Sequence, residues 1–137
     1  MTARRTGLVA SAHDLVERAP RLRYLRLDSA PVPADLEALG RLPLDRLDLG
    51  WIVELEDLRA LIGCRALTEL SLSGCPSVRD LSPIAGLPLL EILDIRDVAP
   101  GIDLAPLAGL PLTKVTIRAG QHALNGDFLG DRLVREA

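Results

Sequence analysis

Hydrophobic residues recur with one spacing along most of the chain. An aliphatic residue is followed by a second one three positions later and by a third one two positions after that, and this motif occurs five times. The motifs begin 22 or 23 residues apart, at Leu22, Leu44, Leu67, Leu90 and Leu112. A fixed period in the twenties is typical of a solenoid, in which each repeat packs against the next.

The last two aliphatic residues of each motif lie two positions apart, so both side chains face the same way on a β-strand. The residues beside them face the opposite way. So short a strand cannot bury a face by itself and needs the strand of the next repeat alongside. The pattern therefore predicts five short parallel strands in one sheet, backed by an aliphatic core.

The second half of each repeat carries its own signal. Thirteen residues after the first motif residue, a carboxylate or amide residue precedes a pair of aliphatic residues. These residues are Asp35, Asp57, Asp80, Asp103 and Asn125. Such a residue is typical of a cap that accepts backbone N–H groups at the start of a helical turn. We therefore expect short helices or 3-10 turns here, and a structural role for the carboxylates.

Two of these segments, Val78–Leu87 (VRDLSPIAGL) and Ile102–Leu110 (IDLAPLAGL), resemble the short bacterial leucine-rich repeats of the internalin type. The resemblance covers about residues 22–120. It implies an α/β solenoid, the leucine-rich repeat horseshoe, with a concave parallel sheet and a convex side of short helices or 3-10 turns. The loop position that is usually Asn or Cys in that family holds Cys75 in only one repeat.

The N-terminal end differs from the repeats. Aliphatic residues between positions 8 and 19 follow helical spacing, and Ser11 and Asp14 have the arrangement of a capping box. Residues 1–20 are therefore expected to form a helical cap, or the convex half of a repeat that lacks its strand.

The C-terminal end also shows helical spacing. Its apolar residues are Leu124, Phe128, Leu129 and Leu133. A helix over residues 121–137 would cover the last strand, because the raw end of a solenoid invites association. With these two caps, residues 1–137 are expected to form one domain.

Composition and charge argue against binding to nucleic acid or to membranes. The formal net charge is −3 and the pI is near 5.3, so there is no global attraction to nucleic acid or to an anionic membrane. No apolar run reaches the roughly 18–20 residues that span a bilayer. His13 and Asp14 interrupt the only N-terminal apolar stretch, so we expect no export signal and a cytosolic protein.

Residues with reactive side chains do not form a recognisable constellation. Cys64 occupies a leucine position and Cys75 an inward loop position, while His13 and His122 lie at opposite ends of the solenoid. No phosphate-binding loop, dinucleotide fingerprint or hydrolase motif is present. The sequence therefore predicts no enzyme, no cofactor and no metal site.

The strand residues that face outward are not constrained by core packing. These residues are therefore candidates for binding a partner. In strand register they form three columns. The columns are Tyr24, Arg46, Glu69, Ile92, Lys114; Arg26, Asp48, Ser71, Asp94, Thr116; and Asp28, Gly50, Ser73, Arg96, Arg118. Neighbouring strands lie about 4.8 Å apart, so Arg26 is expected to pair with Asp48, and Arg46 with Glu69.

From this face we predict a protein-binding surface. Its candidate residues are Tyr24, Arg26, Arg46, Asp48, Trp51, Glu69, Ile92, Asp94, Arg96, Lys114 and Arg118. Tyr, Trp and Arg are the residue types that most often dominate the energetics of interfaces. Three of the basic residues gather near the C-terminal end of the sheet, which favours an acidic partner there. The alternative is a solvated surface whose charges only pair with one another.

Three functions stay open. The first is a non-catalytic module that binds an unknown protein, and we expect it to be a monomer. The second is the sensor segment of a larger NTPase, because the repeats resemble those appended to bacterial NACHT-type ATPases. The third is an architectural module that associates with itself.

Overall fold

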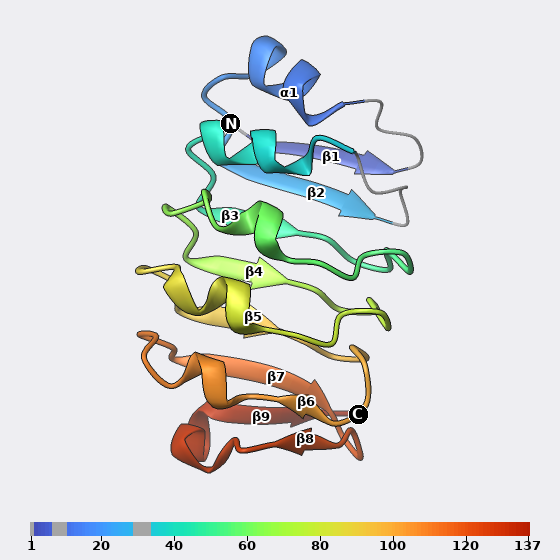
Figure 1. The fold of residues 1–137 in the computed structure, drawn as a ribbon, viewed down its shortest axis with the longest axis vertical. Helices are drawn as coiled ribbons and strands as arrows, with labels where there is room; N and C mark the ends of the chain where they lie inside the picture. Colours follow the sequence, from blue (N-terminus) through green and yellow to red (C-terminus); the bar gives the residue numbers. More distant parts are fainter. Residues whose placement is uncertain (1, 7–10, 29–33) are drawn as a thin grey trace.

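The computed structural model describes residues 2–6, 11–28 and 34–137, with side chains described from Ser11 onward except for Asp28. Strands and short helices alternate along one continuous stack (Figure 1). The strands are β1 Thr2–Thr6, β2 Tyr24–Asp28, β3 Arg46–Asp48, β4 Glu69–Ser71, β5 Ile92–Asp94, β6 Ile102–Asp103, β7 Lys114–Arg118, β8 Ala123–Leu124 and β9 Leu133–Glu136. The helices are α1 Ala12–Arg18 and the 3-10 helices η1 Leu36–Arg41, η2 Arg59–Leu61, η3 Ser82–Gly86, η4 Ala105–Leu107 and η5 Asp127–Arg132.

The main sheet is parallel, in the order β1-β2-β3-β4-β5-β7-β9. Within it Leu47 pairs with Leu25 on one side and with Leu70 on the other, and Leu93 continues the row. This register is the one that the repeat spacing predicts. β6 and β8 form a separate parallel pair.

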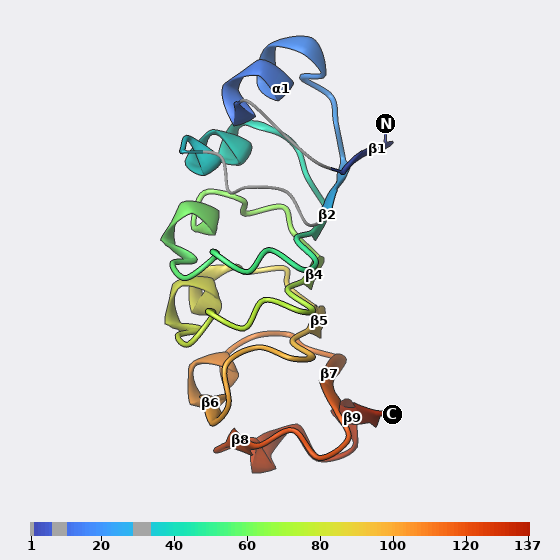
Figure 2. The same ribbon diagram turned by 90° about the vertical axis from the view of Figure 1, so that its right-hand side faces the viewer.

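The sheet and the helices form the two sides of the solenoid. Figure 2 shows the strands along one side, with the outer face of the sheet concave, and the helices along the other. The aliphatic motif residues of all five predicted repeats lie buried between the two sides. The predicted leucine-rich repeat solenoid is therefore confirmed.

Three of the aspartates cap helical turns as predicted. Asp57, Asp80 and Asp103 each accept the backbone N–H of the residue two positions later, at 2.9 Å. Each carboxylate thereby satisfies a donor that the short turn cannot satisfy internally. These carboxylates are structural.

Asp35 acts on the preceding repeat instead of on its own turn. Its two carboxylate oxygens accept the backbone N–H groups of Ala12 and His13, each at 2.9 Å, and the Ser11 hydroxyl donates to it at 2.8 Å. These bonds hold the pKa of Asp35 at about 2, below its ordinary 3.8. The predicted capping box is present as well, because the Asp14 N–H donates to Ser11 Oγ at 3.3 Å.

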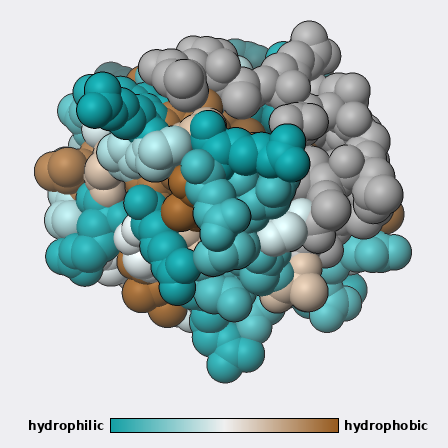
Figure 3. Space-filling view, turned by 90° about the horizontal axis from the view of Figure 1, so that it is seen from above, coloured by the Kyte–Doolittle hydropathy of each residue, from teal (hydrophilic) through white to brown (hydrophobic). Residues whose placement is uncertain are grey.

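The N-terminal segment contains a strand that the sequence did not reveal. β1 pairs with β2 in parallel, so α1 belongs to a repeat with its own strand. The expected first helix is confirmed over Ala12–Arg18, while Leu8, which was assigned to the same helical stripe, lies outside the described residues. Viewed from above, this end of the stack presents hydrophilic residues around patches of hydrophobic ones (Figure 3).

The predicted helix over residues 121–137 is wrong. β8, η5 and β9 occupy this segment, and β9 adds a further strand beside β7, so the main sheet has seven strands among the described residues instead of five. Gly130, at φ 54° and ψ −127°, ends the helical turn, and the Arg132 guanidinium binds the carbonyls of Leu112, Phe128 and Leu129. Of the apolar residues whose spacing suggested a helix, Leu129 is buried and Leu133 is partly buried, whereas Leu124 and Phe128 are exposed.

Candidate binding face on the concave sheet

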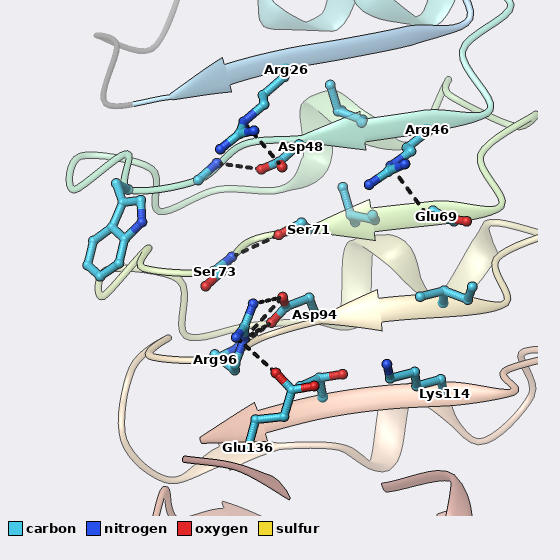
Figure 4. A pocket seen from close by; sticks show the side chains of 16 residues that line it. Arg26, Arg46, Asp48, Glu69, Ser71, Ser73, Asp94, Arg96, Lys114 and Glu136 are labelled. Atoms are coloured by element: carbon cyan, nitrogen blue, oxygen red, sulfur yellow. Dashed lines mark hydrogen bonds and ion pairs between the residues drawn. The ribbon is translucent and has the colours of Figure 1, made fainter. Parts of the chain in front are cut away.

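The concave face of the sheet carries a shallow hollow of about 370 Å³, shown with its lining side chains in Figure 4. It extends from Arg26 on β2 to Glu136 on β9. Nine of the eleven predicted site residues line it: Arg26, Arg46, Asp48, Trp51, Glu69, Ile92, Asp94, Arg96 and Lys114. Tyr24 and Arg118 do not.

Ion pairs between neighbouring strands cross the face as the columns predict. Arg26 Nε lies 3.7 Å from Asp48 Oδ2, and Arg46 Nε lies 3.3 Å from Glu69 Oε2. The Arg46 guanidinium also lies over the Tyr24 ring, 4.6 Å from its centroid. Tyr24 therefore supports an arginine that lines the hollow, through a cation–π contact.

The predicted surplus of positive charge near the C-terminal end is reduced to one residue. Arg96 donates to both carboxylate oxygens of Asp94 and, at 3.0 Å, to Glu136 Oε2 (Figure 4). Arg118 makes an ion pair with Asp97. These carboxylates raise the pKa of both guanidinium groups, so both arginines stay charged and paired.

Lys114 differs from the arginines of this face. No carboxylate among the described residues lies within ion-pair distance of its ammonium group. Its neighbour in register on β5 is the apolar Ile92. On this part of the hollow, a cation without an acidic partner among the described residues therefore lies beside an apolar side chain.

Trp51 lies in the loop after β3 and has an unusual backbone. Its φ is 59°, in the left-handed region, and the equivalent positions of the next two repeats hold Gly74 at φ 78° and Asp97 at φ 60°. A bulky residue in this conformation costs about 1–3 kcal/mol. The Trp51 side chain is nevertheless 58% exposed, so burial in the core does not compensate for that cost.

The indole of Trp51 depends on Gly74. A β-carbon at Gly74 would lie 2.5 Å from the indole Cδ2, so only a glycine allows the ring to lie against this backbone. The ring is thereby held at the edge of the hollow with most of its surface in solvent. Rigid, exposed aromatic side chains of this kind are frequent anchors at interfaces.

Two residues that matter to this face were missed from the sequence. Glu136 reaches the hollow because β9 is a strand. Gln121 links the segment after β5 to the end of β7: its Oε1 accepts the N–H groups of Asp97 and Arg118, and its Nε2 donates to the Ile95 carbonyl. No motif in the sequence marks either residue.

The two cysteines are buried and free. The Cys75 thiol donates to the Leu49 carbonyl at 2.9 Å, as suits the one repeat that keeps the family's loop residue. Burial raises the pKa of both thiols, that of Cys64 to about 11. Neither thiol therefore forms a thiolate nucleophile near neutral pH.

Within the part of the chain that the structure describes, no group of three or more His, Cys, Asp or Glu residues is placed to hold a metal ion. No helix among these described residues is long and apolar enough to cross a membrane.

Comparison with known proteins shows which solved structure the fold is similar to. No protein-family model and no curated protein matches the chain. Among solved structures, an internalin (InlF) of Listeria monocytogenes is similar, with a TM-score of 0.66 and 28% sequence identity over 79% of this chain. The chain spans only about a third of that internalin, 32% of its length. The chain therefore folds as a leucine-rich repeat solenoid similar to that of an internalin.

Proposed function

We propose that the protein is a non-catalytic module that binds another protein through the concave face of its sheet. The observation that carries this proposal is the hollow on that face, with the exposed Trp51 at its edge. The core requires neither the hollow nor the exposed indole. Similarity to a leucine-rich repeat protein supports the coarse assignment, because such repeats typically serve as extended binding surfaces.

The chemistry of the hollow favours recognition over catalysis. Its arginines are held by carboxylates, and the described lining residues include no histidine or cysteine beside Ser71 or Ser73. A hydroxyl nucleophile needs an adjacent base to become reactive. Fixed ion pairs, in contrast, set electrostatic complementarity and thereby partner specificity.

The proposal is tested by affinity capture from the native host with a matched pair of variants. Ile92→Glu changes a residue that lines the hollow, and Ile62→Glu makes the same change at a 50% exposed position on the helical side. We expect a protein retained by wild type and by Ile62→Glu to be lost from Ile92→Glu. Loss from Ile62→Glu alone would move the binding surface to the convex side.

Self-association is the second candidate function, and one observation favours it. β1 and β9 are the outer strands of the main sheet, and the exposed Leu124 and Phe128 lie at the C-terminal end. Open edges of this kind can pair with another chain. A mass that rises with concentration in sedimentation experiments would support it, whereas a constant mass would support the monomer that we expect.

Two finer expectations remain predictions. Nothing in the comparisons supports the sensor segment of a NACHT-type NTPase. A phosphate-binding motif in the coding sequence adjoining that of this chain would support it. A cytosolic location also stays a proposal, and fractionation of host cells with a chain-specific antibody tests it.

A further inference from the structure

We propose that the concave face binds an extended peptide segment of its partner with two anchors, a ring-bearing apolar side chain and a carboxylate about six residues away. This inference rests on the proposed function and adds the chemistry of the partner. The two anchor points are Trp51 and Lys114, and the charged residues between them form ion pairs with one another.

The first anchor point is the Trp51 indole. Its exposure and its left-handed backbone are not explained by core packing, and Gly74 holds the ring in place from one side. The indole is 58% exposed, so surface remains for contact with a flat apolar group. Aromatic and proline side chains offer such a surface, and stacked rings gain more than their buried area alone provides.

The second anchor point is Lys114 with its neighbour Ile92. The ammonium group has no acidic partner among the described residues, whereas each arginine that lines the hollow has one. A carboxylate from the partner would complete this pattern, and Ile92 would shield the new ion pair from water on one side. The partner is therefore expected to be acidic at this point and neutral elsewhere.

The spacing of the two anchor points sets the length of the segment. Lys114 on β7 is three strand spacings from β3, and Trp51 lies a few residues beyond the end of β3. With about 4.8 Å between strands and about 3.3 Å per residue along them, the separation is about 20 Å. An extended chain covers that distance in about six residues.

The middle of the hollow disfavours further charges in the partner. Asp48 and Glu69 pair with arginines on the neighbouring strands, and Asp94 pairs with Arg96 (Figure 4). A charged partner residue placed here would compete with a pair that already exists. An uncharged stretch between the two anchors therefore fits this surface best.

The probe is a displayed library of random peptides long enough to span the hollow, selected on the full chain. Three variants accompany wild type. Trp51→Asn removes the indole but keeps a residue that tolerates positive φ; Lys114→Glu reverses the free charge; and Ile62→Asn is the control on the helical side.

We expect the selected peptides to carry an aromatic residue or proline and an Asp or Glu about six residues apart. By fluorescence polarisation, Trp51→Asn and Lys114→Glu should each weaken the binding of these peptides about tenfold or more. Ile62→Asn should leave it unchanged. Replacing the peptide carboxylate by lysine should restore binding to Lys114→Glu.

Two results would overturn the inference and leave the proposed function intact. The first is that the selected peptides no longer bind Ile92→Glu but bind Trp51→Asn and Lys114→Glu with the same affinity as wild type. The other is no peptide enrichment, while the host protein is still captured in an Ile92-dependent way. Peptides or host proteins that bind all concave-face variants equally would contradict both proposals.

Discussion

At the scale of single residues, Gly74 suits the local backbone conformation of the fold, whereas Trp51 does not. Both occupy the same position of consecutive repeats, and both have positive φ. Glycine adopts this conformation without strain, whereas tryptophan does not. Because the indole lies against Gly74 and remains exposed, core packing does not explain its presence, and this supports the proposed role as an anchor.

Gly74→Ala should destabilise the protein by about 1–3 kcal/mol, since the new methyl group meets both a positive φ and the indole. Chemical denaturation measures the change. Gly120→Ala is the matched control, because Gly120 also has a positive φ, 85°, but nothing lies within 4 Å of its new β-carbon. Adding Trp51→Gly to Gly74→Ala should recover the steric part of the loss. Equal losses of stability in Gly74→Ala and Gly120→Ala would contradict the contact.

At the scale of one element, a strand contributes alternate residues to the core and to the concave face. In β4, Leu70 is 2% exposed and faces the core, while Ser71 lines the hollow. The turns η2, η3 and η4 each depend on a carboxylate of their own repeat, and α1 depends on a carboxylate of the next one. The dependence of α1 on Asp35 links two successive repeats.

Leu70→Asp should abolish the cooperative thermal transition, because a buried, unpaired carboxylate costs a large share of the 5–15 kcal/mol that stabilises a typical domain. Ser71→Asn, one residue later on the outward side, should change the melting temperature little. Circular dichroism distinguishes the two. Similar melting curves for both variants would show that the assigned register is wrong.

Asp35 predicts a dependence of stability on pH. Its pKa is about 2 in the folded chain against an ordinary 3.8, so the carboxylate stabilises the fold above pH 3.8 and loses this effect as the pH falls toward 2. The melting temperature of Asp35→Asn should lie below that of wild type at neutral pH. The gap should close between about pH 4 and pH 2.

Glu37→Gln, at a nearby exposed carboxylate, controls for the loss of one charge. Hydrogen exchange at the first amides of α1 locates the effect. A gap between wild type and Asp35→Asn that does not depend on pH would contradict the role of the ionised carboxylate.

At the scale of the whole molecule, the C-terminal segment completes both the sheet and the binding face. β9 pairs with β7, and Glu136 brings a carboxylate to Arg96, which is already bound to Asp94. The last repeat thereby adds a negative charge to a surface that the middle repeats form. The stability of this end and the charge of the proposed binding face are therefore coupled.

Removing residues 133–137 should lower the melting temperature and promote association, because the edge of β7 loses its partner and Leu129 loses cover. Light scattering at several concentrations measures the association. Arg135→Ala, an exposed position within β9, is the control and should behave as wild type. An unchanged melting temperature after the deletion would show that β9 is dispensable.

Much of the solenoid could be predicted because its repeats are local and regular. A leucine every two or three positions determines which side of a strand faces the core, and the 22- or 23-residue period aligns successive strands. The register that places Arg46 beside Glu69 follows from this period alone. Asp57, Asp80 and Asp103, each thirteen residues after the first residue of its motif, likewise marked three of the turns.

The two ends could not be predicted because their residues depart from the motif. β1 lacks leucines, and the apolar spacing around Phe128 matches a helix as well as one more turn of the solenoid. Tertiary pairing with β2 and β7 decides between these outcomes, since an edge strand gains its hydrogen bonds only from a neighbour.

The sequence by itself determined the solenoid, the register of its strands and most of the residues that face outward, because periodic burial is a local property of the chain. Only the tertiary structure decided which of those outward residues act together. Glu136 neutralises Arg96 from a distant segment, Gly74 supports Trp51 from the next repeat, and Lys114 remains unpaired among the described residues. Such pairings depend on distances between strands and loops, which the sequence pattern does not encode.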